Sequence, residues 1–193
     1  MDTIAGVYAL ALAIEENDMP CPLTFPPLTL LQQREYKTKG YLRLYAVFSS
    51  LEELRLIEEC QQSFVSGVPE TFKRIGNDIR LMSRLESLFD FDCQIQCTEA
   101  ELFVIEPNTY PNSIHREARS TSLVEVGLAV DYSAKTDDGA MEIFPSSHLY
   151  PVKKGTVVRL TSGDLIVFHP GLSYRFLPNR SSRSRSMIFL SFA

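Results

Sequence analysis

The chain has 193 residues, a formal net charge of -5 and a sequence pI near 5.3. Hydrophobic residues make up 45% and charged residues 22% of it, which excludes a disordered or fibrous chain. A chain of this length buries one sizeable core, so we expect one folded domain. Its acidic balance provides no general attraction to phosphate backbones or anionic lipid, and we expect no nucleic-acid partner.

The four cysteines, at positions 21, 60, 93 and 97, lack the density of a disulfide-stapled secreted scaffold. This favours reduced thiols in a cytoplasmic protein. Cys93 and Cys97 would share one face of a strand, but no further Cys or His lies nearby to complete a zinc site. The uncharged run 4–14 lacks preceding basic residues and is shorter than the roughly 20 residues of a bilayer span, so we expect neither a signal peptide nor a membrane anchor.

Residues 1–27 are expected to form an appendage to a domain that spans 28–193. Residues 4–16 predict a short apolar helix, and four prolines within 20–27 predict an extended linker. The apolar helix must bury itself, either on the surface of its own domain or against a partner chain. Both alternatives remain open.

The first half of the domain predicts three helices, at 28–39, 51–66 and 78–89. Gly40 is expected to end the first helix, and the alternating residues 41–47 are expected to follow as a strand. Ser50 begins a capping box for the second helix, and Asn77 is the expected N-cap of the third.

From Phe91 onward the sequence changes to short runs rich in Val, Ile, Phe and Tyr, separated by turn residues. The expected strands lie at 93–97, 101–106, 122–132, 141–144, 156–161, 164–168, 172–176 and 186–192. Helices followed by about eight strands predict an α+β chain. We expect a double-stranded β-helix core, of the jelly-roll or cupin-like kind, with the N-terminal helices packed outside it.

One pair of residues between the strand groups suggests chemistry. His115 and Glu117 are two residues apart, and in an extended chain this spacing aims both side chains the same way. A mononuclear iron(II) oxygenase needs two His and one carboxylate on one face, with other positions left for the co-substrate and oxygen. Taken alone, the pair is more simply explained as part of a surface loop.

The blocks that follow this pair give it more weight. They lie at 127–132, 138–148, 163–168 and 178–181, and end with Arg185. In this order they resemble the phytanoyl-CoA dioxygenase branch of the iron(II)/2-oxoglutarate oxygenases, over roughly residues 28–193. The resemblance implies Fe(II) and 2-oxoglutarate as cofactors, and oxidation of a small apolar metabolite in a lipid or natural-product pathway.

The resemblance also assigns site residues. His115 matches the first metal His, and Glu117 stands where the family usually has Asp. Arg185, six residues after Asn179, matches the Arg that binds the distal carboxylate of 2-oxoglutarate. The planar fork of a guanidinium suits that task because it binds a carboxylate bidentately.

The chain departs from the family at the second metal His, where it has Tyr174. A phenol with a pKa of about 10 must ionise before it binds iron(II), so tyrosine is a poor ligand here. His169 is a substitute only if a loop or bulge near Pro170 turns it toward the site. His148 matches a scaffold histidine of the family, and Ser146 replaces a glycine of the same turn.

Three functions therefore remain open. The first is a non-catalytic relative of these oxygenases that works as a partner subunit. Its partner would be an active dioxygenase, in a hetero-oligomer, or a second copy of the chain, in a homodimer. The second is an active Fe(II)/2-oxoglutarate dioxygenase with altered metal ligation, which hydroxylates or desaturates a small apolar metabolite. The third is a metabolite-binding module that uses Arg185 to hold an acidic ligand. We rank the partner subunit first because one of three metal ligands is missing.

Overall fold

The structure is a computed structural model that describes residues 26–48, 70–89, 94–111, 114–116, 122–130 and 137–193. Several expected features lie outside the described residues: the helices at 4–16 and 51–66, nearly all of the proline-rich linker, Cys93 and Glu117. None of the described helices is long and apolar enough to cross a membrane.

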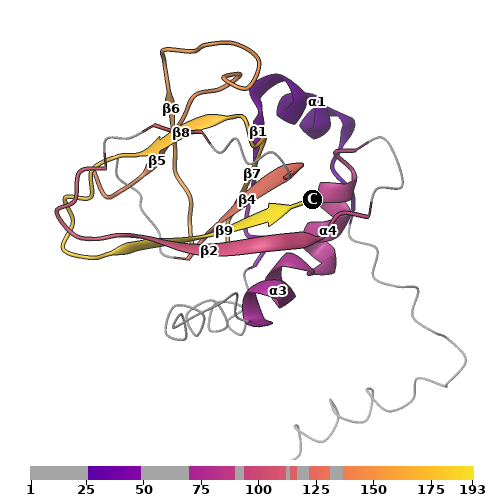
Figure 1. Cartoon of the computed structure of the whole chain (residues 1–193), viewed down its shortest axis with the longest axis horizontal. Helices are drawn as coiled ribbons and strands as arrows, with labels where there is room; N and C mark the ends of the chain where they lie inside the picture. The colour runs from indigo at the N-terminus through magenta and orange to yellow at the C-terminus, as the bar shows by residue number, and fades with distance from the viewer. Residues whose placement is uncertain (1–25, 49–69, 90–93, 112–113, 117–121, 131–136) are drawn as a thin grey trace, which may run out of the picture.

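The described strands form two antiparallel sheets (Figure 1). The five-stranded sheet has the order β1-β7-β4-β9-β2, and the four-stranded sheet has the order β3-β8-β5-β6. The larger sheet contains β1 (Tyr41–Leu44), β2 (Cys97–Ile105), β4 (Val124–Ala129), β7 (Leu165–Phe168) and β9 (Arg185–Phe192). The smaller contains β3 (His115–Arg116), β5 (Met141–Ile143), β6 (Thr156–Val158) and β8 (Ser173–Phe176). From β2 to β9 the chain changes sheet at every step except between β5 and β6, so neighbouring strands are mostly distant in sequence.

Most of the expected strands are present. The segments expected at 93–97 and 101–106 contribute to a single strand, β2, which pairs with β9 along its whole length. The two-residue strand β3 was not expected, because its own sequence has no strand pattern. Pairing with β8 makes it a strand, and such a distant partner cannot be read from local sequence.

Capping residues set the ends of the described helices α1 and α4. Helix α1 (Leu30–Lys39) begins with a capping box between Thr29 and Gln32 and ends at Gly40, whose φ of 80° is left-handed, as expected. Helix α4 (Ile79–Glu86) begins at Asp78 and not at the expected Asn77. The Asp78 carboxylate accepts a hydrogen bond from Arg80 N and also pairs with the Arg80 guanidinium, which explains the preference. Helix α3 (Glu70–Gly76) was not expected.

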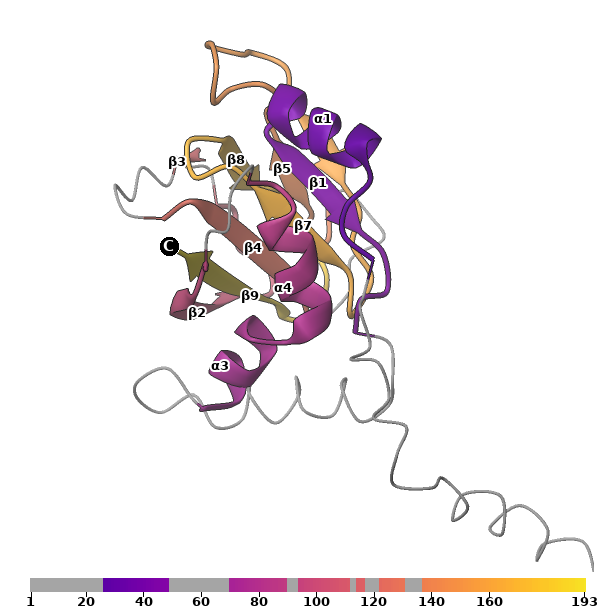
Figure 2. The same ribbon diagram turned by 90° about the vertical axis from the view of Figure 1, so that its right-hand side faces the viewer.

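The central strands of the larger sheet are buried on both faces. Val124, Val126 and Leu128 of β4 belong to one hydrophobic cluster with Leu81 and Leu85 of α4. Figure 2 shows α3 and α4 against this face of the sheet, with α1 beside β1. The opposite face belongs to a second cluster, in which Ala129, Ile166 and Met187 pack against Met141, Ile143 and Phe176 of the smaller sheet. Successive side chains of a strand point to opposite faces of its sheet. The larger sheet therefore divides the core into two parts, a layer under the helices and an interior between the two sheets.

A buried carboxylate joins the first strand to the turn before β7. Asp164 is 1% exposed and accepts hydrogen bonds of 2.7 to 2.8 Å from Ala46 N, from Arg43 Nη2, and from the backbone N and Oγ1 of Thr161. Burial by itself raises the pKa of Asp164, but these hydrogen bonds hold it below its usual value. Gly163 must precede it, because a Cβ there would lie 1.7 Å from the carbonyl oxygen of Phe48.

Replacement of this carboxylate tests its importance. Asp164→Asn is expected to lower the free energy of unfolding at neutral pH by about 3 kcal/mol, because Arg43 loses its buried anion. Since the folded-state pKa of Asp164 is lowered, its contribution is complete above its unfolded pKa of about 3.9 and is lost as the pH falls below that value. Urea unfolding at several pH values should therefore show wild type and variant converging in acid.

Glu35→Gln is the matched control, because it breaks an exposed ion pair with Lys39 one helical turn away. That change should cost less than about 0.5 kcal/mol. Equal losses in the two variants would contradict the importance of the Asp164 network.

Candidate functional site

A cavity of about 500 Å³ opens between the two sheets, and we call it the His115 chamber. Six strands, β2, β3, β4, β7, β8 and β9, supply its walls, and they come from both sheets. They are Glu99, Ala100, Glu101, Phe103, His115, Glu125, Phe168, Tyr174, Phe176, Phe189 and Ser191. The volume lies within the range of about 300 to 1,000 Å³ that is typical of small-molecule sites.

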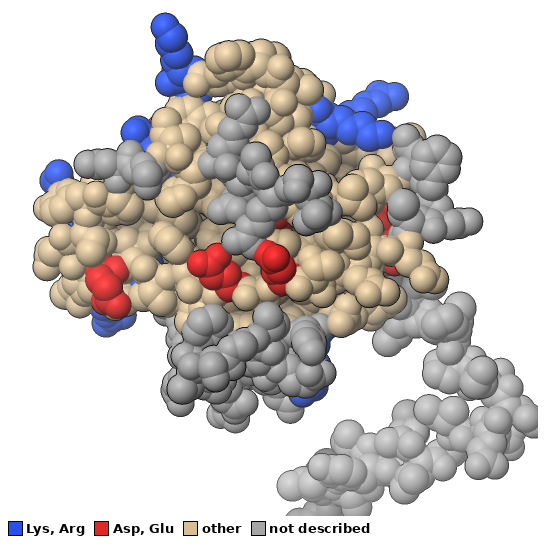
Figure 3. Space-filling model, viewed as in Figure 1, with Lys and Arg blue, Asp and Glu red and all other residues tan. Residues whose placement is uncertain are grey.

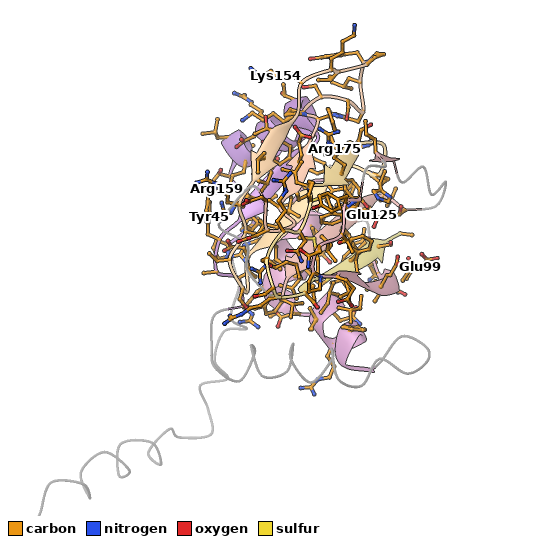
Figure 4. All side chains as sticks on the ribbon, turned by 90° about the vertical axis from the view of Figure 1, so that its left-hand side faces the viewer. Tyr45, Glu99, Glu125, Lys154, Arg159 and Arg175 are labelled. Atoms are coloured by element: carbon orange, nitrogen blue, oxygen red, sulfur yellow. The ribbon has the colours of Figure 1, made fainter. Side chains whose placement is uncertain are left out.

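The chamber carries acidic residues that no sequence motif had indicated. Glu125 is 3% exposed, and its Oε2 accepts a hydrogen bond of 2.8 Å from Ser191 Oγ on the adjacent strand β9. Figure 4 places Glu125 and Glu99 on the same side of the molecule, away from Tyr45 and Arg159. Figure 3 shows acidic side chains in the middle of one face, at the level of β2. The available signal was a single Glu in the otherwise apolar run 123–130, which local patterns do not distinguish from an exposed residue.

The structure brings His115 and Tyr174 together. They are register partners in β3 and β8, and their rings are stacked with centroids 5.6 Å apart and planes inclined by 23°. Tyr174 is 5% exposed and also stacks on Phe189, at 5.9 Å. Its ring meets Phe168 and Phe176 edge to face, at 5.4 and 6.0 Å. Tyr174 is therefore a packed member of the aromatic interior.

His169 lies elsewhere. It is absent from the walls of the His115 chamber, and its ring centroid lies 4.9 Å from that of His148. Its backbone N donates to Gly40 O at the end of α1, and its Nδ1 accepts from Gly171 N. The His148 Nε2 lies 3.3 Å from Lys37 O. These contacts place the two histidines against the C-terminus of α1.

Arg185 does not line the His115 chamber either. It borders a separate pocket of about 30 Å³ together with Phe103, Met141, Phe176 and Met187. Its Nη2 lies 3.7 Å from Asp138 Oδ2, so a carboxylate of the chain itself faces the guanidinium. Arg185 also borders a surface hollow that contains Arg180 and Arg183.

The described residues do not fit an iron(II) centre. The lone pair of an imidazole nitrogen lies in the plane of its ring, so a metal shared by His115 and Tyr174 should lie close to both ring planes. The rings of His115 and Tyr174 are instead stacked, so they turn their faces toward each other. No group of three His, Cys, Asp or Glu is placed to hold a metal in the part of the chain that the structure describes, from which Glu117 is missing.

The described residues do not fit 2-oxoglutarate either. Arg185 and His115 border two neighbouring pockets, which share the walls formed by Phe103 and Phe176. The walls of the His115 chamber include three glutamates and, among the described residues, no Lys or Arg.

No protein-family model matches the chain. Among curated proteins, Maestro heat-like repeat family member 5 of Homo sapiens is 26% identical to it over 146 residues. The match covers 76% of this chain and 11% of that protein. The chain therefore spans about a tenth of the length of the curated relative that it matches.

Several solved structures have a similar fold. SnoN, a non-heme α-ketoglutarate-dependent epimerase from nogalamycin biosynthesis, has a TM-score of 0.72 and 15% identity, with 84% of this chain and 81% of SnoN covered. Apo HygX from Streptomyces hygroscopicus has a TM-score of 0.72 and 14% identity, with 87% of each chain covered. The non-heme monooxygenase ThoJ has a TM-score of 0.71 and 18% identity, with 83% of this chain and 76% of ThoJ covered.

These likenesses show that the chain shares the fold of SnoN, HygX and ThoJ. The solved neighbours bind the cofactors that the sequence implied. SnoN has been solved with Fe3+ and α-ketoglutarate, and HygX with iron or with nickel and 2-oxoglutarate.

The histidine pair beside α1 makes a prediction about pH. Burial, and then the neighbouring His148, lower the pKa of His169 below its ordinary value. Because the folded-state pKa is lowered, the unfolded chain binds the proton more readily, and the free energy of unfolding should fall as the pH drops from about 7.5 to about 5.5. In His169→Asn the side-chain oxygen replaces Nδ1 as acceptor for Gly171 N, and this part of the pH dependence should disappear.

Chemical denaturation across that range measures the slope. His148→Asn removes only the neighbouring charge, so it should reduce the slope less than His169→Asn does. A slope that is unchanged in His169→Asn would contradict the assignment.

Proposed function

We propose that the chain is a non-catalytic relative of the iron and 2-oxoglutarate oxygenases that works as a partner subunit of an active dioxygenase. The active subunit would oxidise a small molecule of the lipid or natural-product kind. The main support is Tyr174, which stacks on His115 where the family has its second metal histidine. Oxygen activation in this class needs a coordinated iron that also binds the co-substrate, so an incomplete site leaves the chain without that chemistry.

The proposal includes a finer description of the fold. Residues 28–193 form a double-stranded β-helix of the phytanoyl-CoA dioxygenase-like branch, with residues 1–27 as a separate appendage. The alternation of β2 to β9 between the two sheets supports the β-helix, and the order of the sequence blocks supports the branch. The helix layer on the larger sheet supports the expectation that helices cover the outside of the core.

The proposed role as a partner subunit is supported by the human relative, in which the matching segment is a small part of the protein. In the human relative the matching segment belongs to a far longer protein, whose name refers to heat-like repeats. Repeats of that kind form extended surfaces that bind other proteins. A domain of this fold attached to such a surface is consistent with a role in assembly, and we place the chain in cytoplasmic complexes of this sort.

The His115 chamber favours a second candidate, a metabolite-binding module. It has the volume of a ligand site and walls that consist largely of aromatic rings. In this form Arg185 has no part, since it borders a different pocket. The third alternative, an active oxygenase with altered ligation, depends on iron held by His115, Glu117 and a further group.

Purified chain supplied with Fe(II), 2-oxoglutarate and oxygen is expected to release no succinate above a heat-denatured control. Iron measured after desalting should be below about 0.1 atom per chain, because the chain lacks a complete ligand set. Tyr174→His is the matched restoration variant. It should raise Ni²⁺ affinity measured by calorimetry, while succinate release stays at background because Arg185 remains outside the chamber.

Assembly is tested by co-expression with a catalytically complete dioxygenase of the same organism, followed by size-exclusion chromatography with light scattering. A stable heteromer should bury at least about 1,200 Å² and elute as one species. If the chain alone instead binds iron stoichiometrically and consumes 2-oxoglutarate, the active-enzyme alternative replaces this proposal.

A further inference from the structure

The smaller sheet ends at strand β6, whose outer edge pairs with no strand in the described part of the chain. On its other side β6 pairs antiparallel with β5, where Met141 lies opposite Val158 and Ile143 opposite Thr156. An edge of this kind presents backbone donors and acceptors to any extended segment that can lie beside it.

The hydrogen-bond ladder shows which backbone groups point outward at this edge. Phe144 N, just after β5, donates to Ser173 O in the same register as the β5–β8 pair, so alternate residues from Phe144 backward face β8. Met141 and Ile143 therefore bond to β6, and Val157, which lies between their partners, turns its N–H and C=O away from β5. No hydrogen bond from another described residue reaches these two groups.

A groove of about 380 Å³ borders this edge, and we call it the β6 groove. Residues 156–159 form one wall, and Tyr41, Arg43 and Tyr45, from β1 and the position after it, line the other. Tyr45 is 70% exposed, and Figure 4 shows it beside Arg159 at one margin of the molecule. The groove therefore lies between an open strand edge and a row of side chains from the larger sheet.

The groove carries one positive charge that no described residue balances. Arg43 pairs with Asp164 at 2.7 Å. Glu35, which also borders the groove, pairs with Lys39 at 2.7 Å. Arg159 is exposed and makes no ion pair with another described residue. A segment that lies in the groove therefore meets Arg159 as its free charge.

We propose that the β6 groove binds an extended acidic segment of the partner dioxygenase, which joins the smaller sheet as a strand beside β6. Val157 exchanges backbone hydrogen bonds with this segment. Apolar side chains on its inner face lie on Tyr41 and Tyr45, and acidic side chains on its outer face pair with Arg159. The inference deepens the proposed function and rests on it in one respect, namely that the chain has a partner subunit.

Charge favours an acidic segment over a second copy of β6. Pairing of two copies edge to edge brings together the cations that flank Val157 in each copy, namely Lys153, Lys154 and Arg159, all of which are exposed. Lys and Arg on an edge strand oppose self-association for this reason. An acidic segment meets the same cations with the opposite sign, and the attraction also speeds its association.

A blocked peptide of alternating Glu and Val serves as the probe, and the same peptide with Lys in place of Glu is its charge-reversed control. Amide NMR of the isotope-labelled chain should show saturable binding of the acidic peptide, with a dissociation constant of roughly 0.1 to 1 mM. At saturation, hydrogen exchange of Val157 N–H should slow by about 10-fold or more, because this group becomes hydrogen-bonded. The basic peptide should bind at least about 10-fold more weakly.

Two variants separate backbone pairing from charge. Val157→Pro removes the outward N–H, which the fold itself does not use, and should weaken binding of the acidic peptide by about 10-fold or more. Arg159→Glu keeps the backbone and should weaken binding by at least about 5-fold, and it serves as the test if the proline variant does not fold. Arg183→Glu is the matched control, because Arg183 is exposed and borders a different hollow, so its binding should equal that of wild type.

The outcomes distinguish this inference from the proposed function. No saturable binding up to about 10 mM, equal binding of the two peptides, or binding that leaves the exchange of Val157 unchanged overturns the inference. Exchange of Val157 that slows as the chain alone is concentrated assigns the edge to a second copy and also overturns it. A heteromer with the dioxygenase in which Val157 exchanges as fast as in the free chain overturns this inference and supports the proposed function. Succinate release by the purified chain overturns the proposed function and leaves peptide binding in the β6 groove intact.

Discussion

The burial of the five-stranded sheet on both faces is the constraint on which the rest of the structure depends. Every residue of β4 is buried, so alternate side chains must fill either the helix layer or the space between the sheets. Val126 faces the helices, while Gly127 lies where a Cβ would approach Ile166 Cγ2 and Met187 Sδ to 3.0 Å. Close packing therefore closes the middle of the interior, and the His115 chamber remains at one end of it.

The same alternation explains the character of that chamber. Residues two apart on β2 and on β9 share its walls, and the register places Glu99 opposite Ser191 and Glu101 opposite Phe189. Further along the strands, aromatic rings fill the interior. The open space of the chamber lies beside Glu99, Glu101 and Glu125. The rings of Phe168, Tyr174 and Phe176 belong to the hydrophobic cluster between the two sheets, so they stabilise the contact between the sheets.

Features with a local physical cause could be predicted from the sequence. Gly40 ends α1 because a left-handed residue is needed there, and the alternating runs gave most strands. Features that depend on distant partners could not. Strand β3 exists through pairing with β8, and Glu125 is buried because of its neighbours across the sheet. For the site, the resemblance named both His115 and Tyr174, which the structure brings together, but the sequence contained no signal that Phe103 and Phe176 stack beside them.

On our proposal the departure from the oxygenase pattern involves more than one substituted ligand. Tyr174 turns a ring face toward His115, the rings of Phe103 and Phe176 are stacked across the interior, and Asp138 faces the Arg185 guanidinium. Each feature opposes co-substrate binding by a different physical effect: ligand geometry, excluded volume and charge. The rings that oppose co-substrate binding also form the interior core, so selection for stability alone would retain them.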